Sequence, residues 1–488
     1  MTITEAVPRT RPPDRRAQRA WLAGFWVSSV AGVALSVAEA TSRPILGARW
    51  TLLDVLAAWA GVWVVGVVCA LHLPMRRRRA VMAIAVVAVA LRLGALASGP
   101  TLSDDLYRYS WDARVQLSGV DPYRYPPQAK ELRALRESWL WPDAAGCAHI
   151  ERPPGCTRIN RPSDRTIYPP VAEGWFAAVY RVGGGIDSRA KLWQGTGLAT
   201  ELATMGVLTA VLLRRRRDPR WLALYGLCPA PVIEVINDGH VDGLAILFLI
   251  AAFLALSPRR GPPTPQTDPT PSERLLPPVP STGRAAVAGT LIGASALVKL
   301  YPIVALLAVW VAPGIRWRHR LASATAAVGL IAVGYAPHVA AVGIKVLGYL
   351  PGYLREEHYT GTSSRFLLPA LFHLHGRAAE EAVVAAVAAT AVVLIVRRPP
   401  AVQAVTILIG VLLLAATPVQ PWYAVTLVAL ATMARKPWWG LVAAAGYPYF
   451  FAVILSAVHQ TGIGQIAYGA AATGVVAISA AGAMSRRR

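Results

Sequence analysis

The sequence predicts an all-α, polytopic transmembrane helical bundle of about 12–14 spans or half-spans. Of its 488 residues, 55% are hydrophobic and only 15% are charged, whereas a soluble protein of this length carries about 25% charged residues. Apolar runs of roughly 17–25 residues recur from end to end, as expected for helices that cross a bilayer. These runs do not alternate apolar and polar residues, which argues against a β-barrel.

Each predicted span is an apolar run bounded by polar, basic or proline-containing sequence. The first run resembles a signal peptide, but it is long for a cleaved one and further spans follow, so we interpret it as a retained helix. The run 285–313 contains Lys299-Leu300-Tyr301-Pro302 and is interpreted as two short segments. Several other short runs are candidates for half-spans or broken helices. The predicted spans are 20–40, 51–73, 80–98, 190–213, 220–237, 240–256, 285–313, 320–337, 378–397, 402–416, 418–434, 438–457 and 463–483.

The net charge of +23 comes from basic residues grouped at the ends of apolar runs, such as Arg76–Arg79 and Arg214–Arg217. Such grouping marks cytoplasmic loops rather than a nucleic-acid surface. If Arg76–Arg79 is cytoplasmic, the polar segment 99–168 is external. The next run, 167–182, has about 15 residues, which is short for a span. If it does not cross, nearly every later basic cluster is also cytoplasmic, so we expect it to re-enter or to lie at the interface.

This topology divides the chain into membrane and loop regions. A Pro-, Ser- and Thr-rich stretch is expected to be a disordered linker between two halves that show no clear internal repeat. The regions are a basic cytoplasmic tail (1–19), the first three transmembrane helices (20–98), an external loop with short interfacial or re-entrant helices (99–189), transmembrane helices (190–256), the cytoplasmic linker (257–284), transmembrane helices (285–337), a second external loop (338–377) and C-terminal transmembrane helices (378–488).

Two of the four cysteines, Cys147 and Cys156, lie together in the first external loop. In an oxidising compartment they are able to form a disulfide, and two free thiols are the alternative. Their spacing alone does not decide between the two. Cys69 and Cys228 lie in apolar runs and are expected to be inert core residues.

The most informative polar feature is the pair Asp104-Asp105, which directly follows a predicted span and opens the longest polar segment. Adjacent carboxylates repel each other, so such groups usually do chemistry, bind cations or hold a loop together. They are also suited to cap a helix over Leu106–Gln116, and the two interpretations are compatible. A carboxylate within reach of a hydroxyl is a candidate general base.

Other polar residues fall in turns on the same predicted face of the membrane, and each has a structural alternative. Asn237–Asp242 is suited to cap a helix around a tight turn, and Lys299 to snorkel to the surface. Tyr123 and Trp422 are suited to anchor the chain at the interface. The sequence has no structural zinc spacing and no phosphate-binding glycine-rich loop.

At these residues the chain resembles the GT-C superfamily of membrane glycosyltransferases, and most closely the bacterial polyprenol-phosphate-mannose-dependent mannosyltransferases. The resemblance runs from about residue 80 to about residue 435, and it departs at Val241, where many relatives have asparagine. The motifs that carry it are, in chain order, Asp105-Leu106-Tyr107-Arg108-Tyr109, Tyr168-Pro169-Pro170, Gly239-His240-Val241-Asp242, Lys299-Leu300-Tyr301-Pro302 and Pro421-Trp422-Tyr423.

The resemblance implies inverting transfer of one sugar, mannose above all, from a polyprenyl phosphate to a cell-envelope glycolipid or glycan. The reaction would take place on the outer face of the plasma membrane, where an aspartate deprotonates the acceptor and cations stabilise the leaving phosphate. Arg108 has the alternative of locking the acidic loop by pairing with a carboxylate. The implied roles are Asp105 as base and Asp104 as its partner, Arg365, His240 and Lys299 for the donor phosphate, and Arg108, Tyr123, Asp242 and Trp422 for the substrates.

No cofactor is expected, and a need for a divalent metal is left open. The expected partners are the lipid-linked donor, the glycolipid or glycan acceptor and membrane lipids, without nucleic acid. Another sugar on the same type of carrier, such as arabinofuranose, glucose or an aminosugar, is one alternative. A transporter of lipid-linked or small solutes is the alternative from another class, but the gathering of polar groups at one surface favours an enzyme.

Overall fold

A computed structural model shows an all-helical protein, as the sequence predicts. The structure describes residues 14–42, 45–183, 189–257, 280–356, 366–417, 419–454 and 460–484, and every regular element in those ranges is helical. Most of the predicted linker at 257–284 lies outside the described residues, as do residues 1–13, Arg365 and His459.

Seven helices of the described chain are long and apolar enough to cross a membrane. At 1.5 Å per residue, a helix of about 20 residues spans the hydrocarbon core. One of these helices passes the predicted end at residue 337, with Pro337 inside it. The long helices are α1 (Arg15–Ala40), α2 (Ile45–Leu71), α3 (Arg77–Gly94), α7 (Arg189–Arg214), α13 (Trp317–Val342), α16 (Gly376–Arg397) and α20 (Thr461–Met484).

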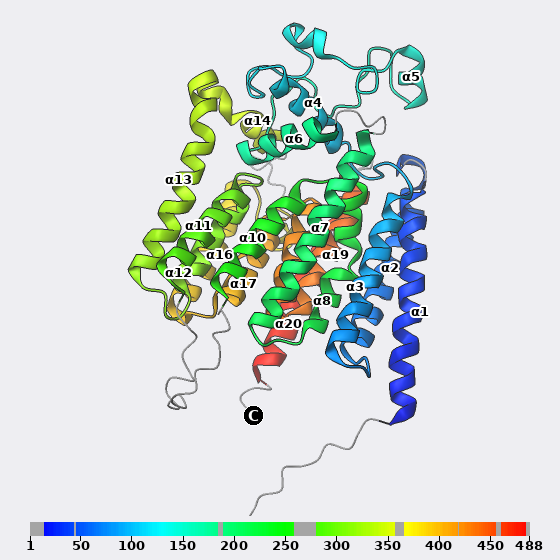
Figure 1. Ribbon diagram of the computed structural model, residues 1–488, viewed down its shortest axis with the longest axis vertical. Coiled ribbons are helices and arrows are strands. Elements are labelled where there is room, and N and C mark those ends of the chain that lie inside the picture. The colour runs from blue at the N-terminus through cyan, green and yellow to red at the C-terminus, as the bar shows by residue number, and fades with distance from the viewer. Residues whose placement is uncertain are drawn as a thin grey trace, which may run out of the picture.

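Shorter apolar helices complete the bundle (Figure 1). Almost every residue of α18 is buried, which places this helix in the core. The predicted span 285–313 is divided, as expected, at the turn η5 (Tyr301–Val304), which begins beside Pro302. The shorter helices are α10 (Asp242–Leu256), α11 (Thr282–Ala296), α12 (Ala305–Val311), α17 (Ala401–Ala415), α18 (Pro421–Ala434) and α19 (Gly440–Tyr449).

The segment predicted as one span at 220–237 is broken into short pieces. Pro229 and Pro231 interrupt it, because proline lacks the N–H that a continuous helix needs and clashes with the preceding turn. The last piece is π-helical, a rare geometry that is frequent at functional sites. The pieces are η3 (Pro219–Trp221), α8 (Leu222–Gly226), α9 (Pro229–Pro231) and η4 (Val232–Asn237). The predicted span 438–457 is also divided, into η7 (Pro437–Trp439), α19 and η8 (Phe450–Ile454).

Residues 99–183 form a polar cap over one end of the bundle (Figure 1). Helix α6 lies in this polar cap beside α4, and the expectation that 167–182 does not cross the membrane stays a prediction. The polar cap follows η1 (Ala95–Ala97) and contains α4 (Asp105–Leu117), η2 (Lys130–Leu135), α5 (Ala144–His149) and α6 (Pro170–Gly183). Three further short helices lie later in the chain: η6 (Gly343–Leu347), α14 (Leu350–Glu356) and α15 (Leu367–Ala370).

An aromatic cluster fastens the polar cap to the bundle. Tyr109 of α4 stacks on Phe176 of α6 with ring centroids 4.3 Å apart, and it meets Trp193 of α7 edge-on at 5.6 Å. Such contacts stabilise beyond the apolar area that they bury. Cys147 of α5 forms a disulfide with Cys156, which decides between the two alternatives left open by their spacing. Cys69 and Cys228 are free and buried.

A buried carboxyl pair, Asp112 on α4 and Glu173 on α6, lies at the interface of these two helices. Glu173 accepts hydrogen bonds from the Thr166 hydroxyl at 2.6 Å and from Gln116 Nε2 at 2.7 Å. Burial, together with the charge of Asp112, raises the pKa of Glu173 well above its ordinary value. The contact between α4 and α6 is therefore most stable when Glu173 is protonated.

Candidate active site

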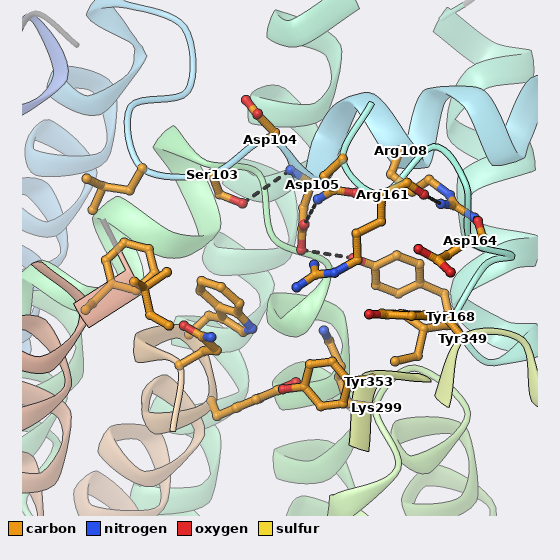
Figure 2. A pocket seen from close by; sticks show the side chains of 18 of the residues that line it. Ser103, Asp104, Asp105, Arg108, Arg161, Asp164, Tyr168, Lys299, Tyr349 and Tyr353 are labelled. Carbon is orange, nitrogen blue, oxygen red and sulfur yellow. Dashed lines mark hydrogen bonds between the residues drawn. The ribbon is translucent and has the colours of Figure 1, made fainter. Parts of the chain in front are cut away.

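A cavity of about 280 Å³ lies where the polar cap meets the bundle. Figure 2 shows Asp104, Asp105 and Tyr168 from the polar cap and Lys299 from the bundle among the side chains that line it. The bundle side of its lining is mostly aromatic and apolar, and it also carries Lys299 and Gln420. The lining residues are Leu102, Ser103, Asp104, Asp105, Arg108, Asn160, Arg161, Asp164, Arg165, Ile167 and Tyr168 of the polar cap, with Lys299, Tyr349, Tyr353, Gln420, Trp422, Tyr423, Phe450 and Ile454.

The two carboxylates of the acidic motif have different partners. Asp104 is the N-cap residue of α4, but its side chain makes no capping hydrogen bond. Its carboxylate pairs instead with Arg152 at 2.7 Å, and both side chains are partly exposed. Asp105 is the first residue of α4, and its backbone N–H donates to the Ser103 hydroxyl at 3.2 Å. The predicted helix cap is thus supplied by Ser103, which leaves both carboxylates for other contacts.

The carboxylate of Asp105 is held by two neutral donors. Asn160 Nδ2 donates to Oδ1 at 2.6 Å, and the Tyr168 hydroxyl donates to Oδ2 at 2.9 Å. Burial by itself would raise the pKa of Asp105, but the charges of His240 and Lys299, with these two hydrogen bonds, outweigh it and lower the pKa. Asp105 is therefore an ionised carboxylate on the wall of the cavity.

Buried polar groups at the end of η4 shape the chain that leads to Asp105. Asp238 Oδ1 accepts the backbone N–H groups of Thr101, Leu102 and Ser103 at 3.0, 2.8 and 3.2 Å. Gly239 follows with φ +69°, a conformation that glycine adopts without strain. The turn predicted at 237–242 therefore also fixes the acidic motif.

His240 lies behind the cavity wall and is not among its lining residues. Its Nε2 is 3.0 Å from the Ser103 hydroxyl and 3.8 Å from Asp105 Oδ2. Its ring stacks on Trp422 with centroids 4.3 Å apart. Trp422 thus lines the cavity and separates the imidazole from it.

Lys299 belongs to the bundle side of the cavity wall. Its ammonium pairs with the buried Asp242 carboxylate at 3.2 Å. It also lies 5.2 Å from the ring centroid of Tyr168 and 5.4 Å from that of Tyr423, within cation–π range. Asp242 is thereby the counter-ion of a cation that lines the cavity.

Two residues predicted to contact substrate make structural contacts. Arg108 donates to both carboxylate oxygens of Asp112 at 2.9 Å and to the carbonyl oxygen of Asp164 at 3.1 Å, so it locks the loop of the polar cap, the alternative raised by the sequence. Tyr123 is buried, donates to the Tyr168 carbonyl oxygen at 2.6 Å and does not line the cavity. Their roles toward substrate remain predictions.

Sequence reasoning assigned no role to three residues that the structure places at or behind the site. Tyr168 belongs to the Tyr-Pro-Pro motif, but nothing in the motif shows that its hydroxyl reaches Asp105. Asn160 lies in an irregular loop without a recognisable signal. Glu234 did have a signal, because a lone carboxylate in an apolar run usually marks a functional site.

The comparisons with known proteins agree with a sugar-transferring site. A profile described as Glycosyltransferase family 87 matches residues 167–421, more than half of the chain. The match includes Tyr168, His240 and Lys299; it begins after Asp105 and ends at Pro421, directly before Trp422. No curated protein and no solved structure matches the chain.

Proposed function

The chain belongs to glycosyltransferase family 87, a GT-C-like family of membrane glycosyltransferases, and from that premise we propose its reaction. It transfers one sugar, most simply mannose, from a polyprenyl phosphate to a hydroxyl of a cell-envelope glycolipid or glycan, with inversion. The observation that carries the proposal is that the Asp105 carboxylate and the Lys299 ammonium line one cavity. A base for the acceptor and a cation for the leaving phosphate are the two groups that this reaction requires.

Asp105 is the proposed general base. Tyr168 and Asn160 each occupy one acceptor position on its oxygens, and a carboxylate oxygen retains a further lone pair for the acceptor hydroxyl. The two donors orient the carboxylate before substrate arrives. General-base catalysis of this kind contributes about 10²–10⁴-fold to the rate.

Lys299 is the proposed contact for the donor phosphate. Of the two expected cations that lie in the described part of the chain, Lys299 lines the cavity and His240 does not. His240 acts on Asp105 from behind the wall, at 3.8 Å, rather than on the phosphate. Arg365 lies outside the described residues, and its role stays a proposal.

The bundle side of the cavity suits a lipid-linked donor. Trp422, Phe450 and Ile454 form an apolar section of its wall, and Ile454 is 41% exposed on a helix of the bundle. A polyprenyl chain is able to lie along this section with its tail in the bilayer while its phosphate meets Lys299. This geometry favours a lipid carrier over a water-soluble nucleotide sugar.

The polar cap and its cavity are proposed to face away from the cytoplasm, at the plasma membrane. Arg77 and Arg78 begin α3, and Arg216 and Arg217 follow α7, so these four residues lie together at the ends of α3 and α7 that are far from the polar cap. Clustered arginines mark the cytoplasmic side of a membrane protein. The disulfide in the polar cap fits an oxidising compartment.

The test is a donor assay with purified protein in lipid nanodiscs. Polyprenyl phosphates that carry mannose, glucose or arabinofuranose are each incubated with a cell-envelope lipid extract, and the products are identified by mass spectrometry. We expect one of these donors, with mannose first, to yield a glycosylated lipid. Transfer from a nucleotide sugar, with no transfer from any polyprenyl-phosphate sugar, would contradict the proposal.

A further inference from the structure

A second cluster of ionisable side chains lies behind the cavity wall. Glu234, Asp238 and His240 are 1%, 0% and 2% exposed, and they offer potential ligand atoms that all lie within 4.8 Å of one another. The reaction proposed above uses none of the carboxylates in this cluster. Buried carboxylates without cationic partners are strongly unfavourable in a low-dielectric interior.

Hydrogen bonds already occupy one atom of each of the three side chains. Glu234 Oε1 accepts from the Tyr447 hydroxyl at 2.8 Å, Asp238 Oδ1 accepts backbone N–H groups, and His240 Nε2 contacts the Ser103 hydroxyl. Glu234 Oε2 and Asp238 Oδ2 are left for a common ligand. His240 Nδ1 lies 2.9 Å from the carbonyl oxygen of Glu234, a hydrogen bond that an ion at Nδ1 would replace. Within the described residues, the buried Asp238 Oδ2 has no hydrogen-bond partner.

Glu39 provides an independent indication of a ligand. It is fully buried on α1, which packs against η4, and neither of its carboxylate oxygens has a hydrogen-bond partner in the described part of the chain. The charges of Asp238 and Glu234 act on this carboxyl group, so all three acids share one low-dielectric site. A lone imidazole does not offset three carboxylates.

The separations suit a metal ion. Glu234 Oε2 is 3.4 Å from His240 Nδ1. Ligand atoms about 2.1 Å from a tetrahedral Zn²⁺ lie about 3.4 Å from one another. Two carboxylates and one imidazole form a mixed oxygen and nitrogen donor set, which suits Zn²⁺ or Mn²⁺.

We propose that Glu234, Asp238 and His240 bind one divalent metal ion of the Zn²⁺ or Mn²⁺ class, whose charge also offsets that of the nearby Glu39 carboxylate. The ion occupies His240 Nδ1, so that Nε2 carries the proton and donates to Ser103. This second contact fixes the imidazole beside Asp105, because outer hydrogen bonds orient metal-binding histidines. The metal thereby positions the chain that carries the base and does not itself touch substrate.

Metal analysis of purified protein tests the proposed metal site without any measurement of sugar transfer. A negative result would therefore count against the metal site and leave the proposed reaction untouched. The protein is produced without a histidine tag in medium with Zn²⁺ and Mn²⁺, and its metal content is measured by mass spectrometry. We expect about one ion per wild-type chain, and loss of that ion in Glu234→Gln and Asp238→Asn. The matched control is Glu201→Gln, which removes an equally buried glutamate that pairs with Arg92 and should retain the ion.

A second measurement covers variants that fold poorly. After treatment with EDTA, added Zn²⁺ or Mn²⁺ should raise the thermal midpoint of the wild type by several degrees, and that of Glu39→Gln by clearly less. Absence of a stoichiometric ion from the wild type, or equal metal content in the wild type and Glu234→Gln, would overturn the proposal. A midpoint that metal does not change would overturn it as well.

Discussion

Replacement of Lys299 separates its structural contribution from its proposed contact with the donor. Its side chain is 13% exposed and pairs at 3.2 Å with Asp242, which is 1% exposed. Lys299→Met leaves a buried carboxylate without a counter-ion, and breaking a buried pair in this way costs about 3–5 kcal/mol. The double variant Lys299→Met/Asp242→Asn removes both charges, so it should recover most of that stability.

Activity should not recover in the double variant. A charge-assisted hydrogen bond to the donor phosphate is worth about 1.5–3 kcal/mol, which corresponds to about 10- to 150-fold in kcat/KM. The assay measures thermal unfolding and transfer kinetics of the wild type, the two single variants and the double variant. Asp242→Asn alone retains the cation and should keep more activity than the double variant.

A second buried pair supplies the control. Arg92 and Glu201 interact at 2.6 Å, both fully buried and away from the cavity. The double variant Arg92→Met/Glu201→Gln should retain activity wherever it retains stability. If the Lys299→Met/Asp242→Asn protein regains wild-type kcat/KM together with its stability, Lys299 is a structural residue and the reasoning is wrong.

Three further predictions concern the polar cap. Tyr168→Phe removes a hydrogen bond that lowers the pKa of Asp105, so the acid limb of the kcat/KM profile should move to higher pH; an unmoved limb would argue against Asp105 as the base. Because the pKa of Glu173 is raised in the folded protein by burial and by Asp112, the stability that this group contributes should be fully present below its ordinary pKa and be lost as pH rises through the raised pKa. Glu173→Gln should abolish this decline in thermal midpoints, and an identical decline in the variant would refute the assignment. Cys147→Ser opens the disulfide loop and should cost about 2–4 kcal/mol of stability, together with a fall in kcat. Reduction of the disulfide in the wild type should have the same two effects. Unchanged stability and kcat would show that the disulfide does not stabilise the polar cap.

The membrane helices were predictable because their signal is local. A long apolar run bounded by arginines specifies a span almost by itself, as α3, which follows Arg76, and α16, which ends at Arg397, show. The break within 220–237 was missed, although Pro229 and Pro231 are visible in the sequence. The hydropathy of that segment is high throughout, and proline is tolerated in many membrane helices.

The candidate site was predictable only in part. The acidic motif and Lys299 could be named because charged residues at a membrane boundary are costly and therefore informative. The side of the wall on which His240 lies depends on the stacking of Trp422, a contact between residues far apart in the sequence. The same holds for Asn160, which reaches Asp105 from a loop that carries no pattern of its own.

The most direct test of the central claim is single-turnover transfer by Asp105→Asn, with Asp104→Asn as the neighbouring control. Asp104 pairs with Arg152 at a partly exposed position, where an ion pair contributes about 0–1 kcal/mol, so its variant should stay within several-fold of the wild type. Asp105→Asn should fold, bind the polyprenyl-phosphate sugar and lose about 10²–10⁴-fold in the rate of transfer. A correctly folded Asp105→Asn protein that transfers sugar at the wild-type rate would contradict the account.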